Sequence, residues 1–326
     1  MKALVYDGVE QLGFRDVPDA VPRFGEHLIR VEAVGICGSD MHAYLGHDAR
    51  RTEPLILGHE AAGVIVGGGK DGMRVTVNPL VTCGECWPCI SGRENLCGAR
   101  QIISMAPREG AFAQYIAMPE INLVEVPADI PFAKAALAEP LAVSWHATRL
   151  GLESLHPSMD KRALVLGGGA IGLAAALALK AMGVDDVTIA EPNEVRRGFL
   201  TERCGQKTVA VAERHFPMVI DAVGYAATRT TASALVEAGG VIIHVGLGED
   251  KDGLDIRRMT LQEITFIGTY TYTAQDFRDV AHALFAGRLG ALDWIEERSL
   301  AQGVGAFQDL RAGSVPAPKV MLSPWA

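Results

Sequence analysis

The 326-residue sequence lacks features that mark several common protein classes. It has no run of Lys and Arg, and its net charge of -9 argues against a nucleic-acid partner, whose phosphates attract clustered cations. The longest uncharged stretch, residues 163–179, is short for a membrane span and contains a glycine triplet. We therefore expect neither a nucleic-acid-binding protein nor a membrane protein.

The N-terminal residues MKALVYDGVE contain no apolar signal region, so export is not expected. The sequence has only six cysteines, and four of them lie between residues 83 and 97. In a cytoplasmic, reducing compartment such a group favours metal binding over disulfides. No fixed-period repeat or low-complexity tail is present, and a chain of this length usually forms two domains.

The two halves of the chain differ in their sequence pattern. Up to about residue 140, short β-type runs such as KALVY, HLIRVEAV and AAGVIV alternate with Gly, Pro and Asp, which predicts an irregular, mostly antiparallel β domain. From Ala163 onward, apolar strands alternate with helical segments, which predicts a parallel sheet covered on both faces. The ending PKVMLSP predicts a strand that returns to the first domain. We predict an α/β protein with a discontinuous β-rich domain, residues 1–143 and 288–326, and a doubly wound domain, residues 144–287.

A glycine-rich motif, GGGAIG at residues 167–172, follows the predicted strand RALVL and opens a predicted helix. In this context the pattern G-x-G-x-x-G indicates a dinucleotide-binding turn, because the helix N-terminus faces the pyrophosphate. A methyltransferase or a flavin protein is the alternative. The cofactor-binding residues predicted here are Gly167, Gly169, Ala170, Ile171 and Gly172.

The next predicted strand ends at Glu191. A carboxylate there accepts hydrogen bonds from the ribose hydroxyls of NAD and repels the extra phosphate of NADP. Arg196 and Arg197 follow closely and weaken this preference, so NADP is the less favoured alternative. The turns DAVG and HVGLG end the fourth and fifth strands, where open sheets bind ligands. They add Val223, Gly224, Val245, Gly246 and Leu247 to the predicted cofactor site.

The segment CGECWPCISGRENLC, within a lobe at residues 80–100, contains Cys83, Cys86, Cys89 and Cys97. A tetrahedral zinc site needs four thiolates that converge from a compact loop, and two overlapping C-x2-C steps supply them. Iron–sulfur clusters use similar spacings in a different context, and unligated buried thiols are the remaining alternative. Because four thiolates leave no open position, we predict a structural rather than a catalytic zinc ion.

Other metal-ligating side chains are spread along the first half of the chain. Cys37 lies in GICGSDMH, and His59 lies in GHE. A catalytic zinc ion needs about three protein ligands and one exchangeable position. The third ligand is Glu60 or Glu139, the latter in AEPLAVSWHA. Taken alone, Cys37 could be a buried core thiol and His59 a core or surface histidine. The prediction of a catalytic zinc site therefore rests on their occurring together, upstream of a nucleotide-binding turn.

The order of these motifs resembles the zinc-dependent medium-chain dehydrogenase/reductases, in particular their polyol (sorbitol), butanediol and threonine dehydrogenase branch. The resemblance covers essentially the whole chain, from GICGSDMH and GHEAAG through AEPLAVSWHA and GGGAIG to KVMLSP. It implies a GroES-like catalytic domain, a Rossmann domain, one catalytic and one structural zinc ion, and NAD. It also implies that Ser39 takes the alcohol proton and that His42 passes it on.

The resemblance implies a function as well. We expect oxidation of a secondary alcohol of a polyol, diol or sugar derivative to a ketone, in a homodimer or homotetramer. The alternatives are a dehydrogenase specific for threonine or for a simple alcohol, a non-catalytic nucleotide-sensing relative, and a zinc-ribbon module. We expect the polar tract Thr269–Thr273, which contains Tyr270 and Tyr272, to line the substrate or cofactor cleft. Two stretches, residues 67–73 and 205–217, are shorter than the family pattern.

Overall fold

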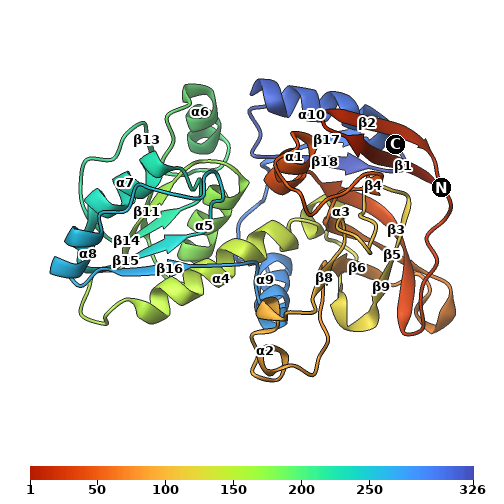
Figure 1. Ribbon diagram of the computed structural model, residues 1–326, viewed down its shortest axis with the longest axis horizontal. Coiled ribbons are helices and arrows are strands. Elements are labelled where there is room, and N and C mark those ends of the chain that lie inside the picture. The colour runs from red at the N-terminus through yellow and green to blue at the C-terminus, as the bar shows by residue number, and fades with distance from the viewer. The chain divides into compact units, whose positions relative to one another are not determined.

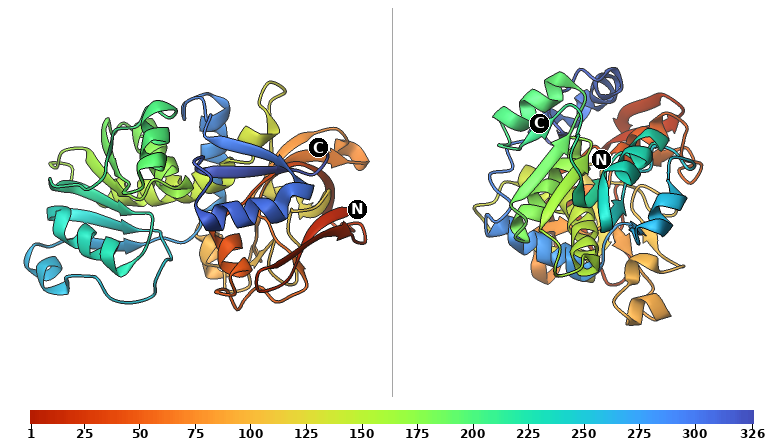
Figure 2. Two further views of the ribbon diagram at one scale, coloured as in Figure 1. Left: turned by 90° about the horizontal axis from the view of Figure 1, so that it is seen from above. Right: turned by 90° about the vertical axis from the view of Figure 1, so that its left-hand side faces the viewer.

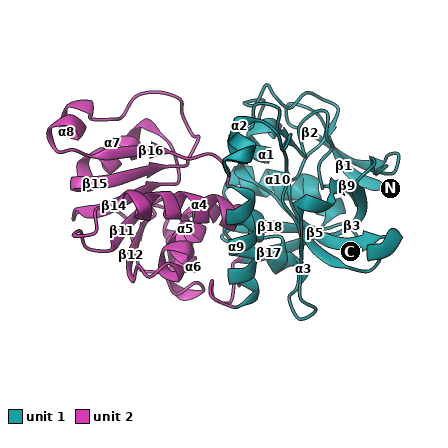
Figure 3. Ribbon diagram, turned by 90° about the horizontal axis from the view of Figure 1, so that it is seen from below, with its two compact units in different colours: residues 1–139, 273–286, 295–326 teal, residues 140–272, 287–294 magenta.

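The computed structural model describes residues 1–326 and divides into two compact units (Figure 3). Unit 1 holds residues 1–139, 273–286 and 295–326, and unit 2 holds residues 140–272 and 287–294. Both ends of the chain belong to unit 1 (Figure 3), and they are marked N and C in Figures 1 and 2 as well. None of the helices combines the length and the apolar character that a membrane crossing needs.

Unit 1 is built mainly from antiparallel strands, as the sequence predicts. Its largest sheet has the order β10-β6-β5-β3-β18-β17, with β9 also paired to β3, and smaller sheets have the orders β2-β1-β4 and β7-β8. The strands are β1 (Lys2–Gly8), β2 (Gln11–Asp16), β3 (Glu26–Gly35), β4 (Leu55–Ile56), β5 (Glu60–Val66), β6 (Arg74–Val77), β7 (Leu80–Val81), β8 (Gln101–Ile102), β9 (Tyr115–Pro119), β10 (Leu123–Glu125), β17 (Ile295–Ser299) and β18 (Lys319–Ser323).

The last strand, β18, pairs with β3, so the C-terminal segment completes the sheet of the N-terminal segment. Its side chains Val320, Met321 and Leu322 are fully buried, which explains why an apolar run ends the sequence. Helices of unit 1 are α1 (Gly38–Tyr44), α2 (Trp87–Ile90), α3 (Phe132–Ala135), α9 (Ala274–Phe285) and α10 (Gly303–Ala312).

Helix α9 belongs to unit 1, although the sequence pattern assigns residues 273–286 to the parallel-sheet domain. Phe277, Val280, Ala281 and Leu284 recur at helical spacing and are buried, and α9 contacts α3. Thr273 starts the helix, because its hydroxyl accepts a hydrogen bond from the Asp276 N–H. The apolar face of α9 therefore has its partner in unit 1.

Unit 2 contains a six-stranded sheet in which all pairs are parallel, with the order β13-β12-β11-β14-β15-β16 (Figure 1). This is the strand order of a Rossmann fold, in which the order reverses between the first and the fourth strand. The strands are β11 (Arg162–Leu166), β12 (Asp186–Ala190), β13 (Thr208–Val209), β14 (Phe216–Asp221), β15 (Val236–His244) and β16 (Thr265–Gly268).

The predicted doubly wound parallel sheet is thus confirmed. Its β11 and β14 are almost entirely buried, as apolar strands covered on both faces should be. Helices α4 (Ala138–Ser154), α5 (Ala170–Ala181), α6 (Glu194–Glu202), α7 (Ala226–Leu235) and α8 (Ile256–Leu261) accompany the sheet, α4 starting in unit 1. Residues 210–215 join β13 to β14 without a helix, so the short sequence there corresponds to a missing crossover helix.

Candidate metal and cofactor sites

The four-cysteine cluster, Cys83, Cys86, Cys89 and Cys97, lies in the lobe between β7 and β8, and its ligand atoms all lie within 4.8 Å of one another. The Sγ–Sγ distances are 3.8 Å for Cys83–Cys89, 3.4 Å for Cys86–Cys89 and 3.6 Å for Cys97–Cys83. A disulfide would need about 2.05 Å, whereas a tetrahedral zinc ion with Zn–S bonds of about 2.3 Å spaces its sulfurs by about 3.8 Å. The four thiols therefore fit zinc rather than a disulfide.

Local backbone geometry brings these thiols together. Gly84 and Gly92 have φ values of +77° and +73°, which side chains disfavour, and Cys86 precedes the first turn of α2. Backbone N–H groups of Glu85 and Cys86 lower the pKa of Cys83 to about 6, which favours the thiolate that a metal ion needs. A backbone N–H also lowers the pKa of Cys86, but desolvation and the neighbouring thiols raise it to about 12, so without a metal ion the cluster favours one thiolate rather than four.

The second group, here called the Cys37 cluster, consists of Cys37, His59 and Glu60. Cys37 follows β3 and precedes α1, while Glu60 begins β5. The antiparallel register pairs Gly35 with Glu60, which places the end of β3 beside the start of β5. The ligand atoms of the three residues lie within 4.8 Å of one another, and the side chains of His59 and Glu60 are buried.

Asp40 holds the parts of the Cys37 cluster together. Its buried carboxylate accepts hydrogen bonds from Cys37 N at 3.0 Å and Gly58 N at 3.2 Å, and Oδ1 lies 3.4 Å from His59 Nδ1. Burial alone would raise the pKa of Asp40, but the charges of His59 and Arg51 outweigh it and lower that pKa to about 2. The anionic Asp40 orients the imidazole and leaves His59 Nε2 for another ligand.

The side chain of Glu60 packs directly against Gly35, where no larger residue would fit. A Cβ atom on Gly35 would lie 2.0 Å from Glu60 Oε2. The other oxygen, Oε1, accepts a bond of 2.6 Å from Lys319 Nζ, and both side chains are buried. Burial alone would lower the pKa of Lys319, but the charges of Glu60 and Cys37 raise it. Lys319 is therefore a buried cation whose charge offsets the negative charge of the Cys37 cluster.

The donor set of the Cys37 cluster fits a zinc ion. Glu60 Oε2 is buried and has no hydrogen-bond partner, and it lies beside a thiol and an imidazole. An unpartnered buried carboxylate oxygen is costly unless a cation completes it. Glu139, the other predicted third ligand, lies outside this group, in the first turn of α4. It is buried and its charge also raises the pKa of Lys319.

The two residues predicted to move the proton lie on α1. Ser39 Oγ is 3.5 Å from His59 Nε2 and 3.3 Å from Arg51 Nη2, so the serine lies at the side of the imidazole that faces the ligand set. His42 is half-buried and its ring contacts His47 edge to face, with 6.2 Å between the ring centroids. The structure brings Ser39 to the cluster and places His42 one helical turn further along.

Three residues at this site were not found from the sequence. Arg51 donates to the backbone of Ser39, Ser104 Oγ lies 3.3 Å from His59 Nδ1, and Lys319 pairs with Glu60. For Lys319 a signal was available, because a lysine in an otherwise apolar terminal strand needs a buried acidic partner. Neither Arg51 nor Ser104 lies in a motif that distinguishes it from surface residues.

The glycine-rich turn in unit 2 has the geometry of a phosphate-binding loop. Gly167 follows β11 with a φ of +93°, and a Cβ on Gly172 would lie 1.8 Å from the Gly167 carbonyl oxygen. A Cβ on Gly169, in contrast, would meet nothing within 4 Å. Gly169 precedes α5, so the open space lies at the N-terminus of a twelve-residue helix. The residues therefore fit a pyrophosphate, and Ala170 and Ile171 form the first turn of the helix.

Glu191 is fixed next to this turn. One carboxylate oxygen accepts the Gly168 N–H at 2.9 Å, the other accepts the Asn193 N–H at 2.8 Å, and Arg196 Nη1 lies 3.4 Å from Oε2. Arg197 donates to the backbone carbonyl of Glu191 instead. The carboxylate is thus held beside the glycine-rich turn, and Arg196 lies near enough to offset part of its negative charge.

The ends of β14 and β15 meet backbone to backbone. A Cβ on Gly224 would lie 2.2 Å from the Gly246 carbonyl oxygen, and one on Gly246 would lie 2.1 Å from the Val223 carbonyl carbon. Asp221 accepts the N–H groups of Val223 and Gly224, at 3.0 and 2.9 Å. Val245 and Leu247 flank Gly246, and Leu247 is 75% exposed. The predicted turn residues therefore lie together at one edge of the sheet.

The polar tract of residues 269–273 has mixed roles. Thr273 caps α9, Tyr272 is fully buried, and Thr269 Oγ1 donates to the His244 carbonyl oxygen at 3.4 Å. Thr271 has a φ of +47° and a buried hydroxyl without a hydrogen-bond partner. Much of the tract therefore serves local structure.

Comparison with known proteins gives two matches to described families. Residues 23–128 match the alcohol dehydrogenase GroES-like domain, and residues 170–286 match the zinc-binding dehydrogenase family. The first match covers both candidate metal sites except Glu139, and the second covers most of the candidate cofactor site. The predicted GroES-like and Rossmann domains are thereby confirmed.

Several characterised proteins are similar to this chain over most of their length. L-galactonate-5-dehydrogenase of Escherichia coli K12 is 32% identical over 89% of both chains. Sorbitol dehydrogenase of Bacillus subtilis is 32% identical over 83% of this chain and 82% of its own. An alcohol dehydrogenase of Escherichia coli CFT073, solved with NADH, has a TM-score of 0.88 and 25% identity over 99% of both chains.

Proposed function

Because the chain belongs to the zinc-dependent medium-chain dehydrogenase/reductase family, we propose that it oxidises a secondary alcohol of a polyol, diol or sugar derivative to the ketone with NAD. The observation that carries this proposal is the Cys37 cluster, whose soft thiol, imidazole and unpartnered carboxylate oxygen suit a catalytic zinc ion. When bound, the zinc ion polarises the substrate hydroxyl and the nicotinamide accepts the hydride.

The protein's own residues position and deprotonate the substrate. Ser39 Oγ, near His59, accepts the proton of the substrate hydroxyl, and His42 relays it onward. Asp40 keeps His59 in one orientation, and Lys319 offsets the charge of Glu60. We assign Cys37, His59 and Glu60 as ligands of the catalytic zinc ion, with Glu139 as the alternative third ligand. Cys83, Cys86, Cys89 and Cys97 hold a second, structural zinc ion.

The substrate class rests on the ligand set and on the relatives. A carboxylate as third ligand, from Glu60 or alternatively from Glu139, in place of a second thiolate leaves a harder zinc ion that suits polyhydroxylated ligands. The galactonate and sorbitol dehydrogenases described above act on the sugar-derived compounds in their names. Loss of a hydroxyl that the site binds should lower kcat/KM strongly, because its buried partner is left unpaired.

The test of the substrate class compares kcat/KM for polyols, diols, sugar acids and threonine with that for a simple secondary alcohol of equal carbon number. We expect a polyol or sugar acid to exceed the simple alcohol by at least about 100-fold. Equal values would reject the polyol class, and a preference for threonine would move the protein to another branch of the family. No turnover with any alcohol would leave the nucleotide-sensing alternative.

The choice of NAD over NADP rests on Glu191, whose carboxylate is fixed beside the glycine-rich turn. Glu191→Ala should lower kcat/KM with NAD and narrow the ratio of NAD to NADP by about tenfold, because the ribose hydrogen bonds and the repulsion of the phosphate disappear. A wild-type protein with higher kcat/KM for NADP would show that Arg196 outweighs Glu191.

We also propose a homodimer or homotetramer. Strand β16 is at the edge of the parallel sheet, with one side unpaired, and Leu247, Ile256 and Leu261 of the same unit are 75%, 62% and 71% exposed. Light scattering after size-exclusion chromatography measures the mass directly. A mass near 34.7 kDa, that of one chain, would reject the proposal.

A further inference from the structure

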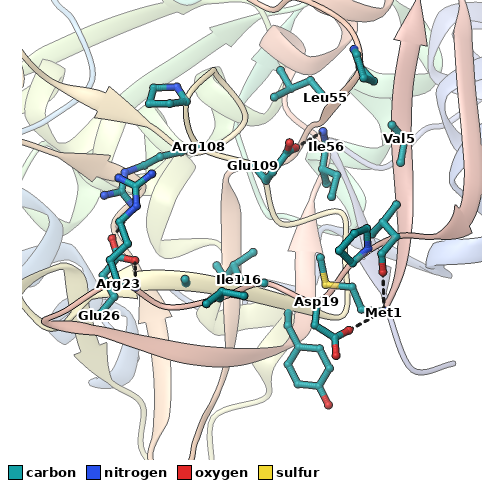
Figure 4. A pocket seen from close by; sticks show the side chains of 18 of the residues that line it. Met1, Val5, Asp19, Arg23, Glu26, Leu55, Ile56, Arg108, Glu109 and Ile116 are labelled. Atoms are coloured by element: carbon teal, nitrogen blue, oxygen red, sulfur yellow. Dashed lines mark hydrogen bonds and ion pairs between the residues drawn. The ribbon is translucent and has the colours of Figure 1, made fainter.

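A pocket of about 480 Å³ in unit 1 shares no residue with either metal cluster (Figure 4). Its walls come from β1, β2, β4 and β9, from the segment that leads into β3, and from residues 107–109. Much of the wall is apolar, including Val5, Leu55, Ile56 and Ile116. A volume of this size is within the range of small-molecule sites, which combine apolar walls with a few polar groups.

Three arginines line this pocket, and two of them are already paired. Arg15 forms a two-pronged ion pair with Asp7, and Arg108 Nη1 lies 2.9 Å from Glu26 Oε1, with both side chains nearly buried. Arg108 Nε also donates to Gln101. The paired arginines are therefore part of the wall.

The third arginine, Arg23, has an unpaired guanidinium group. Its backbone N–H donates to Glu26 Oε2 at 3.0 Å, but its side chain makes no hydrogen bond or ion pair. Figure 4 shows Arg23 and Arg108 together with Glu26 at one end of the pocket. Arg23 helps to lower the pKa of Glu26 through its charge but makes no ion pair with it, so this exposed guanidinium keeps its hydrogen-bond donors for a ligand.

The acidic residues of the pocket have their own partners. Glu26 is held by Arg108, and Glu109 Oε2 accepts the Ile56 N–H at 2.7 Å. Burial alone would raise the pKa of Glu26, but hydrogen bonds from Arg23 N–H and Arg108 lower it, so the carboxylate stays charged. One carboxylate group of a ligand matches the single guanidinium that has no ion pair.

We propose that this pocket is a second ligand site, which binds a monocarboxylate with an apolar body of about six to ten carbons. The carboxylate pairs with Arg23, and the hydrocarbon body contacts the walls formed by β4 and β9. Backbone hydrogen bonds join the wall of this pocket to the segment before His59, since Gly110 N donates to Ile56 O at 2.7 Å and Ala111 N donates to Gly58 O at 2.8 Å. The wall that the ligand touches therefore continues directly into the segment that carries His59.

The test is isothermal titration of the zinc-loaded protein with octanoate, and with octanamide as the neutral analogue of equal length. We expect saturable binding of octanoate and at least about tenfold weaker binding of octanamide, which lacks the charge. Arg23→Gln should weaken octanoate binding at least about tenfold, while Arg257→Gln, the same charge change at an exposed arginine of α8, should leave it unchanged.

A second variant tests the location without changing any charge. Ala20→Trp places a large ring into the pocket from a loop and should abolish octanoate binding. The proposal is overturned if octanoate does not bind, if octanamide binds equally well, or if both pocket variants bind octanoate as the wild type does. Binding that is lost only in Cys37→Ala would place octanoate at the catalytic centre and also overturn it. These heats do not depend on turnover, so a failure of the dehydrogenase assignment leaves this test intact.

Discussion

The two metal clusters of unit 1 differ in their ligand atoms and are assembled in opposite ways. The four-cysteine cluster comes from fifteen consecutive residues, and its lobe exposes apolar side chains such as Trp87 at 75% and Ile90 at 68%. The Cys37 cluster joins the ends of two strands, and Glu60 at its centre is fully buried. The first cluster depends on local spacing, whereas the second depends on the tertiary fold.

The surroundings of the clusters differ in the same way. The thiols of the four-cysteine cluster contact mainly one another and backbone N–H groups. The Cys37 cluster is surrounded by charged groups, with Asp40 and Arg51 beside His59 and Lys319 on Glu60. A zinc ion with four thiolate ligands has no open position and can only stabilise structure. A zinc ion in the mixed Cys37 cluster would keep a position for an exchangeable ligand such as a substrate.

The largest expected effect is on catalysis. Cys37→Ala removes the soft ligand of the Cys37 cluster and should lower kcat/KM by about 10³-fold or more, since the zinc ion supplies several kcal/mol of stabilisation of the developing alkoxide. The melting temperature should change little, because Cys37 is partly exposed. Cys204→Ala, a half-buried thiol in unit 2, is the control and should keep full activity. Wild-type kcat/KM in Cys37→Ala would refute the assignment of the catalytic metal.

The buried pair of Glu60 and Lys319 gives the next largest effect. Lys319→Met leaves a buried carboxylate without its cation and should lower the free energy of unfolding by about 3–5 kcal/mol, measured by urea denaturation. The double variant Lys319→Met with Glu60→Gln removes both charges and should regain more than half of that loss. If the double variant is no more stable than the single one, the pair does not balance the charge of the cluster.

The four-cysteine cluster should affect stability rather than chemistry. Cys89→Ser weakens metal binding that is coupled to folding of the lobe, and should lower the free energy of unfolding by about 2–3 kcal/mol. Proteolysis within residues 83–97 should become faster, as followed by mass spectrometry. Cys204→Ser provides the matched control. Resistance to protease equal to that of the wild type would mean that the lobe holds its shape without the metal ion.

A smaller effect tests how the fold positions His59. Gly110→Ala would place a Cβ 2.2 Å from the Leu57 carbonyl oxygen, so the segment before His59 must shift. We expect a loss of about 1–3 kcal/mol in unfolding free energy together with lower activity. Gly69→Ala is the control, because a Cβ there meets nothing within 4 Å. Equal stability and activity of the two variants would show that this segment does not position the cluster.

The sequence predicts the four-cysteine cluster well because its chemistry is local. Spacing alone brings Cys83, Cys86, Cys89 and Cys97 together, and the glycine-rich turn of unit 2 is local in the same sense. The apolar runs of β11 and β14 likewise predict a buried parallel sheet, because strands covered on both faces have apolar residues at nearly every position.

The Cys37 cluster is harder to predict, because its partners come from distant parts of the chain. Spacing alone leaves Glu60 and Glu139 as equal alternatives, and only the register of β3 with β5 places Glu60 beside Cys37. The contacts of Arg51 and Lys319 depend on tertiary packing in the same way, and so does the membership of α9 in unit 1. A lysine in an apolar strand indicates a buried acidic partner, but local pattern does not identify which distant residue that partner is.

The most direct measurement follows zinc release and activity together while a mild chelator acts on the protein. We predict two zinc ions per chain. One is lost quickly together with all activity, while the circular dichroism spectrum stays unchanged, and the other is lost slowly as the lobe unfolds. The fast ion should be absent from Cys37→Ala and the slow ion from Cys89→Ser. Full activity with one zinc ion or none per chain, or simultaneous release of both ions, would contradict the division of roles between the two clusters.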